Sequence, residues 1–344
     1  MDKKYTIKDI AELAGVSKGT VDRVLHRRGK VSPKALADVE KVLKEIDYQP
    51  NPIARNLKNN KVYKISVLMP NPKFDAYWVP AVQGIQTAAK EFKPFGVVVN
   101  KFYYNPFDPV SFLEKSQEAL PSSPDALLMA PLFQKEALDI YKECQEKNIL
   151  VALFNNAIDA FNHEHFIGQD LFQSGRVAAS LIDKLVDESA RTAILHLDEE
   201  ANMKLRENGF KSYFEEKNNA APIKTFSLKT SDKELFQKEA VAILKQNPEI
   251  SAVFITNSKT HVFIKAIGKL KNDLTLVGYD LISENVELLK IGCIDFLIHQ
   301  KPKRQAYLGV GYIAEHFLFG KAVPDQNLLP IDVITAENAM YYQE

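Results

Sequence analysis

Residues 6–25, TIKDIAELAGVSKGTVDRVL, have the pattern of two short helices joined by a tight turn. Thr6 can cap the first helix, because Asp9 stands three residues later, where a carboxylate meets free backbone N–H groups. Gly15 ends that helix, and Ser17 caps the second. An apolar face recurs at helical spacing, formed by Ile10, Ala11, Leu13, Ala14, Val16, Val21, Val24 and Leu25. This order of caps, turn and apolar residues is typical of a helix-turn-helix unit.

In such a unit the second helix presents its N-terminal end to a nucleic-acid partner. Here that end carries Lys18, Gly19 and Thr20, followed by Asp22 and Arg23. Basic and hydroxyl side chains suit phosphates and the base edges of the major groove. An ordinary helical hairpin has the same local pattern, so this stretch taken alone leaves both interpretations open.

A third helix is predicted after the basic loop at Arg28, since Ser32 can cap it and Pro33 suits its first position. Its apolar residues at helical spacing are Leu36, Val39, Leu43 and Ile46. The following segment, NPIARNLK at 51–58, allows only two helical turns, and so short a helix is marginal unless something packs on it. Leu57 can then serve as a wedge in a DNA minor groove, or as a linker residue that packs on the next domain.

The distribution of charge separates the first part of the chain from the rest. Residues 1–60 hold 13 Lys and Arg against 8 Asp and Glu, whereas the remainder holds 31 against 36. A basic segment joined to a mildly acidic body suits a nucleic-acid-binding domain that is attached to a domain of different function. At 344 residues, two or three domains are expected. No apolar run has the length of a membrane span and no signal peptide is evident, so we expect a cytoplasmic protein.

From Lys64 onward the chain alternates short, β-rich apolar runs with amphipathic segments such as 79–92 and 172–186. The runs are ISVLM (65–69), GVVVN (96–100), ALLMA (126–130), ILVALF (149–154), TAILHL (192–197), AVFIT (252–256) and LTLVGY (274–279). Such alternation predicts an α/β fold with parallel sheets covered by helices on both faces. The length of this part predicts two doubly wound lobes after the small all-α domain.

Ligands of open α/β sheets bind beyond the carboxyl ends of the strands, so the residues after each run matter most. These positions are 70–78, 131–134, 155–156, 257–259 and 279–280, together with 169–170 after the short run FIG (166–168) and 300 after FLIH (296–299). Amides, carboxylates and aromatic rings dominate them, which favours a neutral polyhydroxylated ligand. A phosphate is disfavoured because no Gly-rich cradle is present. The sequence shows no catalytic motif, and His163 and His165 lack a third ligand, so we expect no enzyme activity, no metal and no cofactor.

Over essentially its whole length the chain resembles the LacI family of bacterial transcriptional regulators. The similarity is carried in order by residues 6–25, by VSPK with YQPNPIARNL at 48–57, and by VGYD at 277–280. The resemblance implies a homodimer on a pseudo-palindromic operator, hinge helices that insert a leucine into the minor groove, and a body like the periplasmic sugar-binding proteins. The expected domains are 1–50 (helix-turn-helix), 51–61 (hinge) and 62–344 (body), with an N-terminal lobe of 62–167 plus 300–326 and a C-terminal lobe of 168–299 plus 327–344.

The resemblance, taken position by position, and the residue patterns described above together assign the site residues. Those expected at DNA are Thr6, Ser17, Lys18, Gly19, Thr20, Asp22, Arg23, Arg28, Ala54, Arg55 and Leu57. Those expected at a small effector are Phe74, Tyr77, Trp78, Asn155, Asp170, Arg206, Asn257, Asp280 and Gln300. Either Tyr77 or Trp78 can point into the cleft. The residue at 22 is commonly Ser in this family and is Asp here, which leaves the operator sequence open.

The function implied is a ligand-responsive transcriptional regulator, most simply a repressor controlled by a sugar-like effector. A nucleoside effector or a sugar-dependent activator are the alternatives. A transport receptor has no use for residues 1–60, and a sugar-processing enzyme needs reactive groups that the sequence does not show. The tail after Val323 has no sustained heptad, so a tetramer built on a C-terminal coiled coil is not supported.

Overall fold

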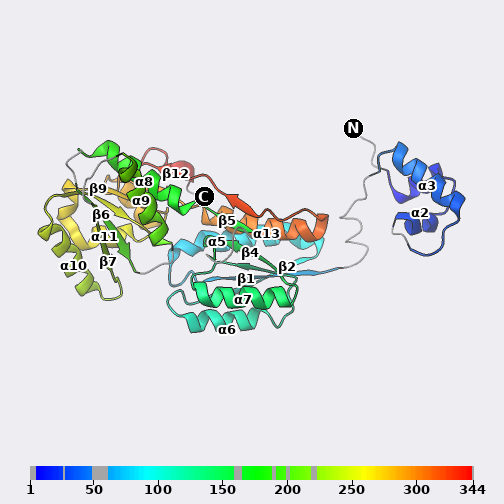
Figure 1. Cartoon of the computed structure of the whole chain (residues 1–344), viewed down its shortest axis with the longest axis horizontal. Helices are drawn as coiled ribbons and strands as arrows, with labels where there is room; N and C mark the ends of the chain where they lie inside the picture. Colours follow the sequence, from blue (N-terminus) through cyan, green and yellow to red (C-terminus); the bar gives the residue numbers. More distant parts are fainter. Residues whose placement is uncertain are drawn as a thin grey trace. The chain divides into compact units, whose positions relative to one another are not determined.

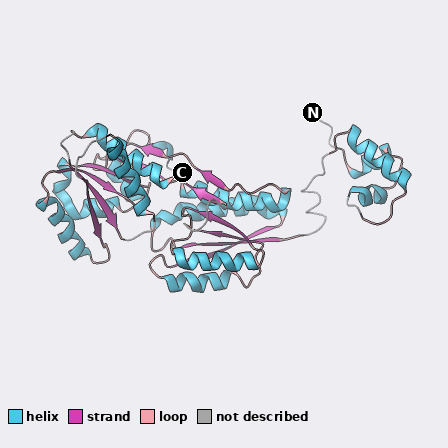
Figure 2. Cartoon of the chain, in the orientation of Figure 1, coloured by secondary structure: helices cyan, strands magenta, loops and turns pink. Residues whose placement is uncertain are grey.

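A computed structural model of the chain describes residues 5–25, 28–48, 61–158, 165–187, 191–198, 202–217 and 223–342 (Figure 1). The chain divides into two compact units, Met1–Lys58, called the head below, and Asn59–Glu344, called the body. Helices and strands alternate through the body, whereas the described part of the head is helical (Figure 2). In the described ranges, no helix has both the length and the apolar character needed to cross a membrane.

The head contains the predicted helix-turn-helix unit and the third helix. Its helices are α1 (Ile7–Leu13), α2 (Lys18–Leu25) and α3 (Pro33–Glu45). At the start of α1, the Asp9 carboxylate accepts from the Thr6 N–H at 2.7 Å and the Thr6 hydroxyl accepts from the Asp9 N–H at 3.3 Å. Gly15 has a φ of +62°, and Ser17 and Ser32 accept backbone N–H groups at the starts of α2 and α3. The predicted caps and the turn glycine are therefore confirmed.

The head core is smaller than the sequence pattern suggested. Its buried residues are Ile10, Ala11, Val21, Val39 and Val42. Leu13 is 56% exposed and Leu36 is 39% exposed, so their placement in the apolar core was wrong. Leu13 is the last residue of α1, and Leu36 lies in the first turn of α3. Val42, which the pattern missed, fills the inner side of α3 instead.

The N-terminal lobe of the body is a parallel sheet with the strand order β11-β5-β4-β3-β1-β2. Its strands are β1 (Tyr63–Pro70), β2 (Val97–Tyr104), β3 (Ala126–Met129), β4 (Leu150–Phe154), β5 (Phe166–Gly168) and β11 (Gln326–Leu328). The helices and 3-10 turns are η1 (Ala76–Trp78), α5 (Val79–Phe92), η2 (Lys93–Phe95), α6 (Pro109–Ala119), α7 (Gln134–Glu146) and α13 (Pro302–Phe319). Helices α6 and α7 cover one face of the sheet, and α5 and α13 cover the other (Figure 1). Because the pleat alternates, Val67 packs toward α5 and α13 while Leu68 packs toward α6 and α7.

The C-terminal lobe repeats this plan with the order β12-β10-β9-β8-β6-β7. Its strands are β6 (Arg191–Leu197), β7 (Ile223–Leu228), β8 (Ile250–Ile255), β9 (Thr275–Tyr279), β10 (Phe296–His299) and the antiparallel β12 (Asp332–Ile334). The helices and 3-10 turns are α8 (Leu171–Leu185), α9 (Met203–Glu216), α10 (Lys233–Gln246), α11 (Thr260–Ile267), η3 (Gly268–Asp273), α12 (Ser283–Lys290) and η4 (Ala339–Tyr342). Helices α8 and α9 pack on one face, and α10, α11 and α12 on the other.

The predicted fold class is thus confirmed, and every apolar run forms a strand. The sequence pattern missed β7, β11 and β12, because these lie at sheet edges and are partly exposed. A short edge strand needs no continuous apolar run, so its pairing depends on the neighbouring strand rather than on its own residues.

The chain passes between the two sheets at three places, near residues 169, 300 and 330. The buried Gln169 joins all three, since its amide nitrogen donates to His299 O at 3.0 Å and to Pro330 O at 2.8 Å. Gly168 still pairs in the N-terminal sheet, as do Asn327 and Leu328. The short strands β5 and β11 therefore extend the first sheet to Gly168 and Leu328, one or two residues past the approximate bounds expected for the N-terminal lobe.

Candidate functional site: a polar cluster in the body and an exposed helix end in the head

The residues that follow the strands of both lobes form one buried polar cluster. Its central side chain is Arg206 on α9, which is only 2% exposed. The guanidinium donates to Thr256 O and to the Gln300 side-chain oxygen, the latter at 2.6 Å. Its Cζ lies 4.2 Å from the ring centroid of Tyr279, a cation–π geometry. Arg206 is therefore held with a fixed orientation beyond the ends of β8 and β10.

Gln300 joins Arg206 to Asp280. Its amide nitrogen donates to one Asp280 carboxylate oxygen at 2.7 Å, and its backbone N–H donates to the other at 3.2 Å. Asp280 adopts a φ of +66° directly after β9, a conformation that Asp and Asn tolerate better than most residues. Three of the residues predicted for the effector are thus in contact.

Burial raises the pKa of Asp280 to about 7, against the opposing effects of the Arg206 charge and the hydrogen bonds from Gln300. The carboxylate of Asp75, which comes from the other lobe, raises it further. A buried carboxyl that can be ionised near neutral pH is a strong acceptor for ligand hydroxyl groups.

On the N-terminal lobe, Tyr77 and Asn155 contribute to the same cluster. The Asn155 amide donates to the Tyr77 hydroxyl, and Asn155 has a φ of +68° directly after β4. Burial raises the pKa of Tyr77 well above its usual range; Asp280 adds to this effect and Arg206 opposes it. Trp78 points elsewhere, since its ring packs edge-on against Phe154 in the lobe core. Between the two aromatic candidates, the structure brings Tyr77 to the cluster.

The other predicted residues are placed less centrally. Asn257 is buried and donates to Leu197 O at 2.7 Å. Asp170 is exposed and caps α8 by accepting from the Gln173 N–H at 2.8 Å, so the structure does not bring it to the cluster. Phe74 is 53% exposed in the loop after β1. Ligand contact by these three residues stays a prediction.

The sequence analysis gave no individual role to Asp75 and Lys259, although both lie in the loops that it singled out; in the structure the charge of Lys259 acts on Asp75 across the lobes. The Asp75 carboxylate accepts from the Tyr77 N–H at 2.9 Å; burial raises its pKa, and the charges of Lys259 and His261 oppose that shift. The ammonium of Lys259 also lies 5.5 Å from the ring centroid of Phe107. Asp75 and Lys259 could have been found from the sequence, because both lie in loops that follow strands. Only the fold shows that these two loops belong to one site.

A second bridge between the lobes is an amide pair. Asn202, at the start of α9, donates from its side chain to the side-chain oxygen of Asn156, which itself donates to Pro131 O at 3.2 Å. Next to the cluster lies a cavity of about 1140 Å³. Tyr77 and Asp280 line it, together with residues of α5, α12 and α13. This volume is ample for a small ligand.

The Asp280 carboxyl predicts how ligand affinity depends on pH. Ligand hydroxyl groups donate to the ionised form, so affinity should rise about tenfold from pH 6 to pH 8 and level off above the pKa near 7. Calorimetry in two buffers of different ionisation enthalpy should detect proton release on binding at pH 6. Asp108→Asn, at the cap of α6, is the control and should keep the same profile. An affinity that does not change over this range would exclude the role given to Asp280.

In the head, the N-terminal end of α2 is accessible. Ser17, Lys18 and Gly19 are exposed, as is Arg23, whose Nε donates to Gly19 O at 3.1 Å. Thr20 is half-buried, and its hydroxyl lies 3.0 Å from that of Ser17. This end offers a basic side chain and hydroxyl groups to a partner.

The remaining residues predicted for DNA vary in position. Thr6 and Arg28 are exposed, and Asp22 is half-buried. Ala54, Arg55 and Leu57, with the rest of the expected hinge, lie outside the described residues. DNA contact by each of these residues remains a prediction.

Comparison with known proteins finds a matching family model for the head and another for the body. Residues 65–322 match the model of the periplasmic binding protein domain, and residues 6–51 match the model of bacterial regulatory proteins of the lacI family. The sucrose operon repressor of Streptococcus mutans is 24% identical over 280 residues, covering 80% of this chain and 82% of that protein. The ribose operon repressor of Lactococcus lactis is 25% identical over 283 residues, covering 80% of each.

A solved structure from Bacteroides fragilis, assigned to the LacI transcriptional regulators, superposes with a TM-score of 0.77 at 28% identity. It covers 82% of this chain and all of that one. The two matched family models, the sequence relatives and the similar solved structure all support the same assignment. The chain belongs to the LacI family of bacterial regulatory proteins and combines its helix-turn-helix head with a periplasmic binding protein domain.

Proposed function

We propose that this protein is a transcriptional repressor whose affinity for operator DNA is controlled by a small sugar. The observation that carries the proposal is the joint presence, in one chain, of an exposed α2 end and a buried polar cluster built from both lobes of the body. The two sequence relatives, named as repressors of sucrose and ribose operons, support it.

The chemistry of the cluster supports a sugar as the effector. Asp280 and Asp75 offer carboxylate acceptors, Asn155 and Arg206 offer donors, and the Tyr77 ring offers an apolar face. Pairs of ring hydroxyls require such a mixture, and the C–H face of a pyranose or furanose suits an aromatic ring. A nucleoside shares the ribose chemistry and is the alternative effector.

Control requires the two sites to be coupled. In the proposed mechanism a homodimer binds a pseudo-palindromic operator in the cytoplasm, with α2 in the major groove and Leu57 in the minor groove. A sugar that bridges Asp280 and Tyr77 closes the two lobes and alters the spacing of the two heads. By reciprocity, operator DNA changes sugar affinity by the same factor as the sugar changes operator affinity.

A sugar titration tests the effector directly. Trp78 is the single tryptophan, and its ring contacts that of Tyr77 with centroids 5.0 Å apart. We expect one member of a panel of mono- and disaccharides to change its fluorescence saturably and to lower operator affinity. Sugar binding that raises operator affinity would make the protein a sugar-dependent activator or corepressed regulator. Nucleoside binding with no response to any sugar would replace the sugar proposal.

Lys18 provides a test of the head. Lys18→Ala should lower affinity for a selected operator by about tenfold to a hundredfold, because one base-edge contact contributes about 1–3 kcal/mol. Gel shifts at fixed salt measure this. Lys41→Ala, on the exposed side of α3 where Lys41 pairs with Glu45 at 3.9 Å, is the control and should have a small effect. Equal losses for both variants would show that only the overall charge of the head matters.

A further inference from the structure

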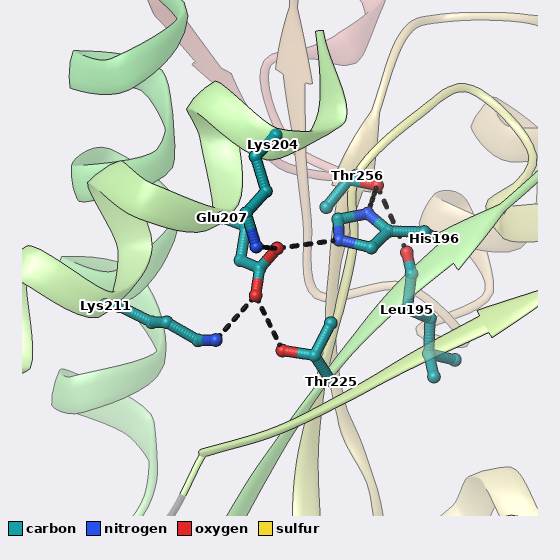
Figure 3. Close-up of polar contacts among 7 residues, drawn as sticks. All are labelled: Leu195, His196, Lys204, Glu207, Lys211, Thr225 and Thr256. Atoms are coloured by element: carbon teal, nitrogen blue, oxygen red, sulfur yellow. Dashed lines mark hydrogen bonds and ion pairs between the residues drawn. The ribbon is translucent and has the colours of Figure 1, made fainter. Parts of the chain in front are cut away.

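Arg206 belongs to a closed ring of contacts that reaches beyond the polar cluster. Glu207, its neighbour on α9, accepts from His196 Nε2 at 3.1 Å, and His196 Nδ1 lies 2.9 Å from the Thr256 hydroxyl (Figure 3). Thr256 O in turn accepts from the Arg206 guanidinium, which closes the ring through the backbone. Arg206, Glu207, His196 and Thr256 are called the ring below. All four are buried.

Within the ring, the Glu207 carboxylate accepts several further hydrogen bonds. One carboxylate oxygen accepts from Lys204 Nζ at 2.8 Å, and the other accepts from Lys211 Nζ at 2.5 Å and from the Thr225 hydroxyl at 2.9 Å (Figure 3). Burial acts to raise the pKa of Glu207, but these donors together with His196 hold it well below its usual range. Glu207 is therefore an anion that fixes α9 against β6 and β7.

The Thr256 end is held by β6 as well. Its N–H and its hydroxyl both donate to Leu195 O at 3.2 Å, while the hydroxyl also contacts His196 (Figure 3). Thr256 directly follows β8, so these contacts set where its carbonyl group points. The His196 side chain connects the Glu207 carboxylate with the Thr256 hydroxyl.

Besides the Tyr279 ring, the Arg206 guanidinium has two hydrogen-bond acceptors, and one of them belongs to Thr256. Its guanidinium donates to Thr256 O and Gln300, whereas its Nε has no hydrogen-bond partner among the described residues. A long arginine side chain loses considerable rotamer freedom when it is ordered, about 2 kcal/mol. Losing one of its two bonds should therefore allow the guanidinium to reorient.

We propose that His196 is a positioning residue of the effector site. It touches Glu207 and Thr256, and through Thr256 it sets the Arg206 guanidinium that Gln300 links to Asp280. This proposal rests on the proposed function, in which Arg206 contacts the effector. The competing interpretation is that the ring only stabilises the packing of α9 on the sheet.

The test observes Arg206 without any sugar. Full-length protein labelled with ¹⁵N-arginine contains eight arginines, and Arg206→Lys assigns the Arg206 Nε–H signal. In His196→Phe we expect this signal to shift and its exchange with solvent to accelerate by about tenfold or more. Thr225→Val is the matched control: it removes another donor to Glu207, lies outside the ring, and should leave the Arg206 signal unchanged.

An unchanged Arg206 signal in a folded His196→Phe protein would overturn the proposal, as would an equal change in Thr225→Val. If His196→Phe does not fold, His196→Gln serves instead, because its amide keeps a donor toward Glu207 while losing the contact with Thr256. The Arg206 signal should change in this variant too, and an unchanged signal would again overturn the proposal.

Sugar binding is the second measurement, and it relates the ring to the proposed function. D-ribose and sucrose are titrated first, and His196→Phe should weaken binding of whichever sugar binds by about tenfold, as for other residues that orient a ligand contact. Thr225→Val should bind as the wild type does, and equal affinities in wild type and His196→Phe would overturn the link. Absence of binding by every sugar of the panel would count against the proposed function, while the arginine signal would still decide the role of His196.

Discussion

Asp280→Asn should lower sugar affinity by about two orders of magnitude or more, while operator binding in the absence of sugar is retained. Asn tolerates the φ of +66° at this position, so the backbone should not change. The substitution creates a conflict between two donors. The new amide has to offer its oxygen to the Gln300 N–H, which leaves its NH₂ group facing the Gln300 amide nitrogen.

Gln300 cannot relieve this conflict by turning over, because its side-chain oxygen accepts from Arg206 at 2.6 Å. A buried charged acceptor is lost as well, and such losses cost about 2–5 kcal/mol in ligand binding. Calorimetry gives the sugar affinity, and gel shifts give the operator affinity with and without sugar.

The matched control is Asp108→Asn, which retains a capping side chain on α6 and lies outside the cluster. It should bind sugar and operator as the wild type does. If Asp280→Asn lost operator binding together with sugar binding, Asp280 would have a folding role rather than a ligand role.

Gly209→Ala should destabilise the body by about 1–3 kcal/mol or more and weaken sugar binding as well. A Cβ at Gly209 on α9 would lie 1.8 Å from Phe172 O on α8, and backbone cannot move aside cheaply. The opposite glycine, Gly175 on α8, has the same relation to Arg206 O, with a Cβ distance of 2.0 Å. The two helices therefore approach closely because both lack a side chain where they cross, and separating them displaces Arg206.

Urea unfolding followed by circular dichroism measures this effect. The control is Gly311→Ala on α13, another helical glycine, whose added Cβ would meet only Phe92 at 3.8 Å, an ordinary contact. It should leave stability unchanged or raise it by up to about 1 kcal/mol, because alanine favours the helix more than glycine does. Equal stability of the two variants would show that α8 and α9 can separate without loss.

Local structure was largely predictable because local residues decide it. Helices begin at capping side chains only a few positions away, those of Thr6, Ser17 and Ser32, and Gly15 ends the first helix. Helix α5 begins and ends where the apolar pattern predicted, at residues 79 and 92. The buried strands were equally clear, since both of their faces must be apolar. The family resemblance in order along the chain also came from the sequence alone.

The direction of side chains was decided by tertiary structure. The pattern left Tyr77 and Trp78 as open candidates, whereas in the structure the Tyr77 hydroxyl accepts from Asn155 and the Trp78 ring packs edge-on against Phe154. Asp170 looked like a ligand residue after a strand, but it caps α8, and its neighbour Gln169 is the buried residue that joins the lobes. A carboxylate after a strand can cap a helix or face a cleft, and the sequence is the same in both cases.

What the sequence determined by itself was therefore the order of elements, the two-part organisation and the residues that follow each strand. Only the tertiary structure joined Arg206, Gln300 and Asp280, residues far apart in the chain, and placed Glu207 and His196 behind them. The physical reason is range: caps, turns and apolar periodicity act over a few residues, whereas a buried polar group is satisfied by whatever partner the packed sheets bring within hydrogen-bonding distance.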